Sequence, residues 1–397
     1  MGFSYKHFLP ILGTGLVTSD GELWQRQRLL LSGHLRVEIL EDIVGIAQRA
    51  ADRFLAKFER YEGTGEPVNL AEELRHLTLQ VIGEASLSLS ADESDSTFPY
   101  LYLPIMEEAN RRVFEPWRAF LPTRTWFQHR ERIKALNAYI TGLLRERWAE
   151  RGGGKGGPPR DMVDRIMDSL VKRKERWTRA VEKQLCYEVK TFVLAGHETS
   201  AAMLAWSVYE LQRRPDALAR VREEADQAMP EPRVVPEKAA VMEMDFTLGA
   251  LKEALRLYSV VPVVTRVSGQ DEVLGGTTVP RGTVVGVLIQ GVHNDPANWE
   301  EPELYRPERF TEGRRPKPFT FLPFIDGPRN CLGQHLALIE GRVVLGRLLQ
   351  RFDFRPVDER QGQKHPSVVP IAPLNNMVVT VHPRQPIAGA RRTRRAA

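Results

Sequence analysis

The sequence predicts a mainly α-helical protein that also contains small β-sheets. Apolar residues recur with a helical period over most of the chain up to about Tyr258. After Pro262 the pattern changes to short segments rich in β-branched residues and broken by glycine and proline. One helical pattern then returns near the end of the chain. The expected order is therefore many helices, then small sheets that bracket a last helix.

Each expected element has its own pattern. The helical period is clearest in residues 35–61, 70–87, 130–148 and 183–213. Strands are expected at residues 263–267, 277–279 and 283–289, and the last helix at about 332–352. Residues 151–159 are rich in glycine and end in two prolines, so they predict a flexible surface connector between helices.

Composition sets limits on the kind of protein. A chain of 397 residues with 42% hydrophobic content can bury a large core, in one large domain or in two. Two cysteines give no disulfide framework, and Cys186 is most simply a core thiol. No run of roughly 18 apolar residues and no signal-peptide order at the start is present. Part of the net charge of +5 belongs to the basic segment 385–397, which we expect to be a disordered tail. A basic stripe suited to nucleic acid is not seen.

The ten residues from Phe324 to Gly333 single out Cys331 as a candidate metal ligand. The apolar spacing after it suits a helix, so its sulfur is expected at a helix N-terminus. There, unpaired N–H groups and the helix dipole favour an anion. Gly327 and Pro328 predict a tight turn, and Gly333 lets the backbone approach a flat macrocycle closely. A buried structural cysteine is the alternative.

The same stretch resembles the haem-binding signature of the cytochrome P450 superfamily, F-x-x-G-x-R-x-C-x-G, at all five fixed positions. The resemblance implies haem b, with its iron held by the thiolate of Cys331 and dioxygen as co-substrate. It also implies that Phe324 shields the sulfur and that Arg329 meets a haem propionate. Gly327 and Gly333 would shape the loop against the haem. The whole chain then resembles an eukaryotic-type member of this family.

A second segment, residues 195–200, lies in the middle of the helix expected at 183–213. Glycine there weakens the helix, and Thr199 can bond back to a carbonyl one turn earlier, so the segment predicts a bend or an opening. It resembles the family's A-G-x-[DE]-T segment, which runs over the distal face of the haem. The resemblance implies that Ala195 and Gly196 border the haem, that Thr199 bonds the bound dioxygen, and that Glu198 connects this place to bulk protons. An ordinary helix kink is the alternative, and we do not expect the neighbouring histidine to be a haem ligand.

Two further groups of residues resemble motifs of this family. Glu253 and Arg256 lie three residues apart on one helix face, and Arg309 belongs to a P-E-R-F segment. The resemblance implies a buried structural triad that holds the loop before the cysteine in register. Trp24 and Arg28 resemble the family's W-x-x-x-R.

The tryptophan and arginine of W-x-x-x-R would bind a haem propionate, while Arg266 and Arg329 would cover the other propionate oxygens. A partly buried packing residue is the alternative for Trp24.

The resemblance to the family also predicts which residues line the substrate pocket. Its expected lining is mostly apolar: Phe192, Val193, Ala195, Gly196, Val261, Val263 and Val264. An apolar substrate follows, such as a lipid, carotenoid, sterol or terpenoid. Residues 194–202, and 109–112 ahead of Trp117, resemble the branch that includes plant and algal carotenoid hydroxylases.

Electrons must come from outside this chain, because it has no flavin or nicotinamide fingerprint. We expect NADPH as the source and cytochrome P450 reductase or a ferredoxin as the partner of a monomeric protein. Arg26, Arg342 and Arg347 are candidates for the docking face, with solvated helix charges as the alternative.

The chain departs from the family at its start. The family usually has about a hundred residues before its W-x-x-x-R, and here Trp24 comes almost at once. Residues 1–384 are thus expected to form a cytochrome P450 domain without the N-terminal anchor and first sheet strands, and the full-length form to associate with a membrane of the endoplasmic reticulum or a plastid.

Three functions remain open. A monooxygenase that hydroxylates an apolar substrate is favoured by Thr199 and Glu198. A related isomerase or dehydratase acting on peroxides typically lacks the helix threonine. The third possibility is a truncated, non-catalytic product that binds haem weakly or not at all.

Overall fold

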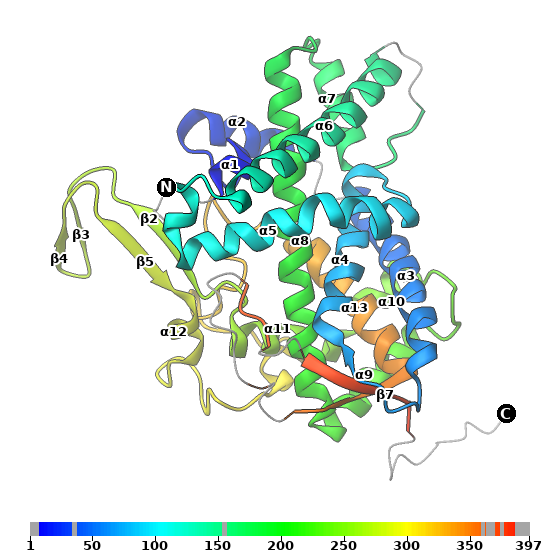
Figure 1. The fold of residues 1–397 in the computed structure, drawn as a ribbon. Coiled ribbons are helices and arrows are strands. Elements are labelled where there is room, and N and C mark those ends of the chain that lie inside the picture. The colour runs from blue at the N-terminus through cyan, green and yellow to red at the C-terminus, as the bar shows by residue number, and fades with distance from the viewer. Residues whose placement is uncertain are drawn as a thin grey trace.

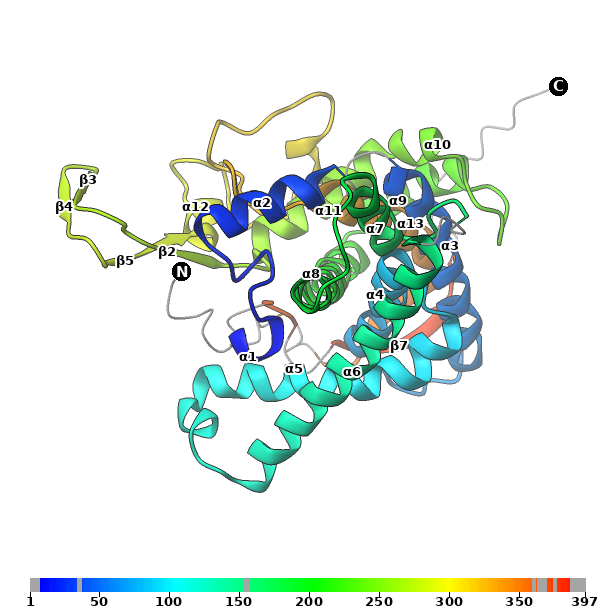
Figure 2. The same ribbon diagram turned by 90° about the horizontal axis from the view of Figure 1, so that it is seen from above.

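Helix α8 (Arg179–Gln212) runs through the middle of the molecule and positions the predicted site. The computed structural model describes residues 8–33, 38–152, 157–358, 362, 370–373 and 377–385. Figure 2 looks nearly along α8 and shows the other helices arranged around it. The side chain of Thr178 caps its first turn by accepting a hydrogen bond from the N–H of Val181 at 3.2 Å.

The remaining helices surround α8. They are α1 (Leu9–Leu12), α2 (Gly21–Ser32), α3 (Glu38–Phe58), α4 (Leu70–Leu87), α5 (Phe98–Phe114), α6 (Arg124–Gly152), α7 (Met162–Lys172), α9 (Pro215–Ala228), α10 (Lys238–Met242), α11 (Asp245–Tyr258), α12 (Ile289–Asn294) and α13 (Gln334–Arg351). Short turns of other helix types are η2 (Glu59–Tyr61), η3 (Glu93–Thr97), η4 (Pro116–Ala119) and η5 (Pro307–Phe310). Among the described helices, none combines the length and apolar content that a membrane span requires.

The core lies where α4 packs along α8 and where α13 packs against α3. Trp206 of α8 is fully buried and stacks on the ring of Tyr258, with ring centroids 3.6 Å apart. Its indole N–H donates to the carbonyl of Ile371 at 3.0 Å, so this aromatic pair also holds the chain that follows α13.

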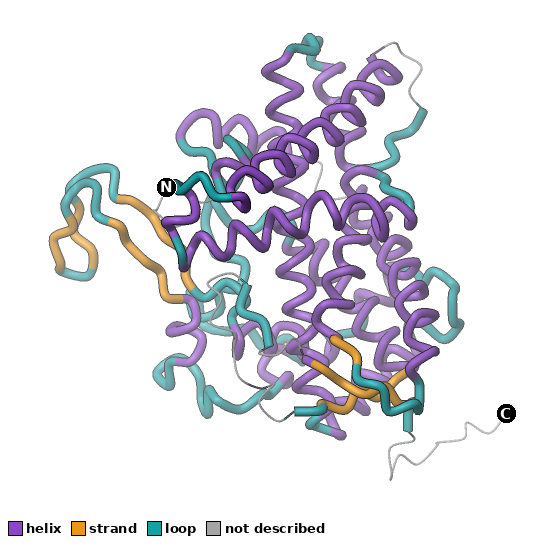
Figure 3. Tube along the Cα trace, in the orientation of Figure 1, coloured by secondary structure: helices purple, strands orange, loops and turns teal. Residues whose placement is uncertain are grey.

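Among the described residues the strands form three small antiparallel sheets, drawn in orange in Figure 3. The strands are β1 (Val68–Asn69), β2 (Val263–Val267), β3 (Glu272–Leu274), β4 (Thr277–Val279), β5 (Val284–Leu288), β6 (Phe352–Pro356) and β7 (Val378–Pro383). One sheet has the order β1-β7-β6, with Val68 opposite Val379. The ribbon β2–β5 pairs Val264 with Val287 and projects from the helical body together with β3–β4.

The observed elements agree with the predicted mainly α architecture. The helix predicted at 70–87 coincides with α4, and the strands predicted at 263–267 and 277–279 coincide with β2 and β4. The last helix begins at Gln334, two residues later than predicted, because Leu332 and Gly333 still belong to the loop. Strand β1, which the sequence analysis did not predict, lies between the helices predicted at 35–61 and 70–87. Residues 153–156 of the predicted connector, and the predicted tail after 385, lie outside the described residues.

Candidate active site

Cys331 lies in a loop just ahead of α13, as the motif predicts. Its N–H donates to the carbonyl of Phe324 at 2.8 Å, and the N–H of Asn330 donates to the carbonyl of Gly327 at 3.1 Å. Gly327 has a φ of +78°, in the left-handed region that favours glycine. The predicted tight turn is therefore confirmed.

The surroundings of the Cys331 sulfur fit a thiolate ligand. Cys331 is exposed, yet nearby protein raises the pKa of its thiol by desolvation, so the sulfur has many protein neighbours and still one open side. The N–H groups of Gly333 and Gln334 and the charge of Arg28 act in the opposite direction and favour the thiolate. A β-carbon at Gly333 would meet no atom nearer than this sulfur, at 3.9 Å. A soft, anionic donor with free space beside it suits haem iron.

Helix α2 brings Trp24 and Arg28 to the same loop. Arg28 donates to the carbonyl of Asn330 at 2.6 Å and also to its side-chain oxygen. The guanidinium of Arg329 lies over the ring of Trp24, 4.2 Å from its centroid, and donates to Asp20 at 2.8 Å. Three of the predicted propionate-binding residues are thus assembled at one end of the cysteine loop.

Arg266 is placed differently. It is exposed on β2, and its guanidinium donates to the carbonyl of its own neighbour Thr265 at 2.8 Å. The contacts described above that assemble Trp24, Arg28 and Arg329 do not include Arg266, so its role at a haem propionate stays a prediction.

The centre of α8 carries the predicted threonine. The Thr199 hydroxyl donates back to the carbonyl of Ala195 at 2.6 Å, which is the bond that the sequence predicts. Ala195 is exposed although it lies in the middle of the central helix, so protein does not cover this face of α8. Helix α8 is assigned as continuous α-helix from Arg179 to Gln212, so this segment does not break it.

Gly196 has a packing function that the sequence analysis did not foresee. A β-carbon there would lie 2.8 Å from two side-chain carbons of Ile82 on α4. The lack of a side chain at Gly196 lets α4 and α8 approach closely, and its place beside the haem stays a prediction.

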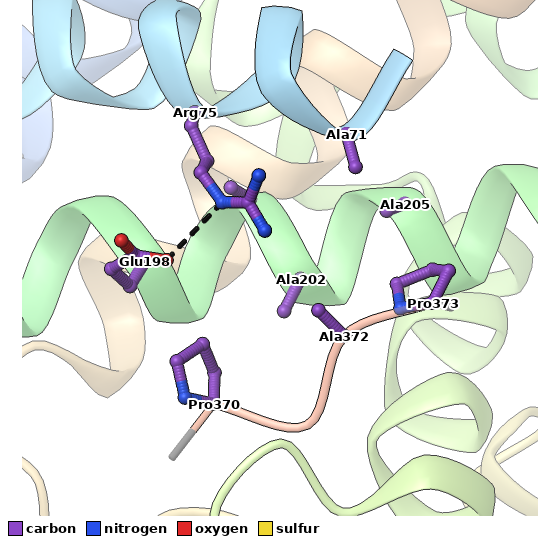
Figure 4. A pocket seen from close by; sticks show the side chains of 9 residues that line it. Ala71, Arg75, Glu198, Ala202, Ala205, Pro370, Ala372 and Pro373 are labelled. Carbon is purple, nitrogen blue, oxygen red and sulfur yellow. Dashed lines mark hydrogen bonds and ion pairs between the residues drawn. The ribbon is translucent and has the colours of Figure 1, made fainter. Parts of the chain in front are cut away.

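Glu198 points toward a guanidinium on α4. The Nε of Arg75 lies 3.3 Å from Glu198 Oε2, and the acid side chain is 16% exposed. Figure 4 shows this pair at one end of a small hollow. The hollow is lined by Ala71, Arg75, Glu198, Ala201, Ala202, Ala205, Pro370, Ala372 and Pro373.

Five of the residues predicted to line the substrate pocket lie outside the hollow beside Glu198. Phe192, Val193 and Val264 are buried, and Val193 has no exposed surface at all, whereas Val261 and Val263 are half-buried. None of the five lines the hollow beside Glu198. The lining role predicted for Val193 is wrong in this structure, because its side chain is used in the helical core.

The predicted triad is assembled. Arg256 donates Nε and Nη2 to the two carboxylate oxygens of Glu253, both at 2.8 Å, and Arg309 Nε lies 3.2 Å from Oε1. Glu253 and Arg256 are fully buried. Arg256 also donates to the carbonyl of His293 at 2.9 Å, so the pair ties α11 to α12 and to η5.

Two of the three predicted docking arginines are buried. Arg26 is exposed, but Arg342 and Arg347 are each 4% exposed. Arg347 donates to the carbonyls of Met229, Glu231 and Val234. The prediction that Arg342 and Arg347 form a docking face is therefore wrong, since backbone carbonyls and neighbouring side chains use their guanidinium groups inside the fold.

Sequence reasoning missed Asn330 and Arg75. Asn330 stands inside the cysteine motif at a position that the motif leaves open, and its bonds to Arg28 connect the loop to α2. Arg75 lies 123 residues before its partner Glu198, and no local pattern links the two.

Comparisons with known proteins agree with this geometry. A family model described as "Cytochrome P450" matches residues 2–379. "Cytochrome P450 4c21" of Blattella germanica is 28% identical over 378 residues, which covers 91% of this chain and 75% of that protein. "Cytochrome P450 4V2" of Mus musculus is 28% identical over 370 residues, covering 88% of this chain and 70% of that protein.

Solved structures show the same fold. The "Crystal structure of cytochrome P450DA heme domain" superposes with a TM-score of 0.84 at 27% identity, over 96% of this chain and 82% of that one. The two relatives carry family 4 names, so a position near the carotenoid hydroxylases stays a prediction.

Proposed function

The chain belongs to the cytochrome P450 family of haem-dependent monooxygenases, and on that premise we propose that it hydroxylates an apolar substrate. One atom of dioxygen would enter the substrate, and electrons would pass from NADPH through a separate redox partner. When bound, the haem supplies the oxygen-activating chemistry that no side chain of this protein offers. The protein contributes binding, orientation and protons.

The cysteine loop carries this proposal. Cys331 would hold the iron, because its sulfur has an open side. Desolvation raises the pKa of its thiol, while two backbone N–H groups and Arg28 act in the opposite direction and would stabilise the thiolate. Phe324, Gly327 and Gly333 would shape the loop around the ligand. Trp24, Arg28 and Arg329 would meet the propionates, and Arg266, which now donates one N–H to the carbonyl of Thr265, would cover the other propionate oxygens.

Thr199 and Glu198 would serve the distal side. Thr199 has its hydroxyl one turn from the exposed Ala195, so it borders the uncovered face of α8. Glu198 would carry protons from the hollow at Arg75 toward that face. A retained threonine favours the monooxygenase over an isomerase or dehydratase that acts on peroxides.

The apolar substrate is proposed from the half-buried Val261 and Val263 and from Phe192, which is 9% exposed. A lipid, sterol, terpenoid or carotenoid would fit these side chains. We propose cytochrome P450 reductase or a ferredoxin as the electron donor.

A reduced carbon monoxide spectrum tests the ligand. The purified protein loaded with haem should show the shifted Soret band of a thiolate-bound iron. Cys331→Ala should abolish that band, while Cys186→Ala should keep it, because Cys186 is buried in the core. The opposite pattern would overturn the assignment, and a protein without any haem spectrum would support the non-catalytic alternative. Turnover that depends on a reductase, compared with turnover on peroxide alone, then separates the two enzyme classes.

We further propose that the corner between α5 and α6 contacts a membrane surface. This corner exposes five large apolar side chains, and Phe120 is 80% exposed. The five residues that define it are Phe114, Trp117, Phe120, Leu121 and Phe127. Figure 2 shows it projecting from the helical body. Arg111, Arg124 and Arg130 are exposed on the same segment and suit anionic headgroups.

A further inference from the structure

Met242 differs from the other methionines in its exposure. It is the last residue of α10 and is 46% exposed. Of the nine methionines in the chain, Met1 lies outside the described residues, and each of the seven others is at most 3% exposed. Met244, two residues further along, is among the buried ones. A dissolved oxidant therefore meets the thioether of Met242 before any other that the structure describes.

The sulfur of Met242 lies beside a buried guanidinium group. Arg342 of α13 donates an Nη1 hydrogen to Met242 Sδ at 3.4 Å, and Arg342 itself is 4% exposed. Its Nε has no hydrogen bond within the part of the chain that the structure describes. A thioether is only a weak acceptor, so this contact does little to compensate a buried cation.

The acids near Arg342 serve another helix. Glu224 accepts hydrogen bonds from two backbone N–H groups in the first turn of α11, each at 2.7 Å. Asp245 accepts one from the N–H of Glu312 at 3.3 Å. Burial lowers the pKa of Arg342, and the charges of Asp245 and Glu224 only partly oppose this effect. Among the described residues, neither acid forms an ion pair with the guanidinium, which therefore lacks a strong acceptor.

Oxidation of Met242 would place such an acceptor at this contact. The oxygen of methionine sulfoxide is bonded directly to the sulfur and is strongly polar, so it would lie within reach of the Arg342 guanidinium. Oxidation usually disrupts a core, because the polar oxygen has no partner there. Here the side chain is half exposed, and its buried neighbour is a donor that needs an acceptor.

We propose that Met242 is a site of oxidation to methionine sulfoxide and that Arg342 binds the sulfoxide oxygen. Hydrogen peroxide is the oxidant: its O–O bond breaks, an S–O bond forms, and the departing hydroxide takes the proton of the transferred oxygen and leaves as water. The sulfur loses two electrons and the peroxide gains them. The step uses no haem, so it is independent of the proposed hydroxylation.

The modification would strengthen the attachment of α10 to α13. These two helices pack side by side, as Figure 1 shows, and α13 is the helix that follows the cysteine loop. Met242 and Arg342 contribute one side chain from each helix to the contact. The sulfoxide would replace a weak hydrogen bond across this interface with a stronger one.

Mass spectrometry of the whole chain after brief treatment with hydrogen peroxide tests the site. Met242 should gain an oxygen several-fold faster than Met244, which lies in the same segment, and Met229, which ends α9. In urea the three should react at similar rates, because unfolding exposes them all. Similar rates in the folded chain would overturn the assignment.

A crystal structure of the oxidised protein tests the role of Arg342. The sulfoxide oxygen should lie within about 3.2 Å of Nη1 or Nε of Arg342. An oxygen that points into solvent, away from the guanidinium, would overturn this role.

Met242→Gln places an amide oxygen near the same position without any oxidant. It should raise the midpoint of urea unfolding, and the rise should be lost in combination with Arg342→Met, which removes the donors. Met242→Leu, which has no acceptor, should shift the midpoint equally whether or not Arg342 is replaced. An equal shift by Met242→Gln in both backgrounds would contradict the proposal. Should Arg342→Met not fold, the structure of the oxidised protein still decides.

Discussion

At the scale of single residues, Gly196 shows how the absence of a side chain supports the site. Alanine is usually better than glycine inside a helix by about 1 kcal/mol. At this position, however, a β-carbon would come within 2.8 Å of Ile82 Cδ1 and Cγ1 and 3.2 Å of its Cβ, so rotation of the side-chain end alone does not relieve the clash. Overpacking of this kind costs about 1–3 kcal/mol, which outweighs the gain in helix propensity.

We therefore expect Gly196→Ala to lower the free energy of unfolding by about 1 kcal/mol, measured by urea denaturation. Ile82→Ala would be destabilising by itself, but it should remove most of the added cost of Gly196→Ala in a double-mutant cycle. Additive effects of the two substitutions would show that the clash is relieved by some other movement. The same contact keeps the backbone beneath Glu198 fixed.

At the scale of elements, the corner between α5 and α6 offers the clearest test of membrane contact. Phe120→Ser combined with Leu121→Ser should strongly reduce sedimentation of the protein with vesicles that contain anionic lipid, because the pair removes two of its exposed apolar side chains. Tyr100→Ser is a matched control, since Tyr100 is 78% exposed but lies near the start of α5, outside the corner. Equal loss of binding in both variants, or no loss in the double variant, would contradict a specific role of this corner.

The individual elements also show which features of the structure could be predicted from the sequence. Helix α4 could be predicted to the residue, because its apolar period is regular and Asn69 caps it by accepting from the N–H of Glu72 at 3.0 Å. The turn at Gly327 and the pairing of Glu253 with Arg256 also followed from local spacing. The contact of Arg75 with Glu198 and that of Gly196 with Ile82 did not, because they join segments more than a hundred residues apart whose spacing carries no shared period. The burial of Arg347 was missed for a related reason: three of its hydrogen-bond acceptors are backbone carbonyls, which every residue carries and which no sequence pattern marks.

At the scale of the whole molecule, buried titratable groups determine how stability depends on pH. Desolvation lowers the pKa of His129, His197 and His293 to about 4. Below pH 6.5 the unfolded chain binds protons at these histidines and the folded chain does not, so stability falls as the pH decreases toward 4. Desolvation raises the pKa of Glu188 to about 7 and of Glu340 to about 8. Above pH 4.5 the unfolded chain releases these protons first, so stability falls as the pH increases through that range.

The two trends oppose each other and place the maximum stability near pH 6.5. Between pH 4.5 and 6.5 the three histidines change the free energy of unfolding more than the two glutamates do, so stability rises with pH. Above pH 6.5 only the two glutamates contribute, so stability falls as the pH increases. Since one group contributes about 1.4 kcal/mol per pH unit, the free energy of unfolding should fall by about 3 kcal/mol toward pH 4.5 and by a similar amount toward pH 8. Urea unfolding at these three pH values measures both slopes. Glu340→Gln should flatten most of the alkaline slope, because Glu340 keeps its proton over the widest interval in the folded state. It should also make the acid slope steeper, since one glutamate instead of two then opposes the three histidines. An alkaline slope that persists in this variant would show that other groups control stability above neutral pH.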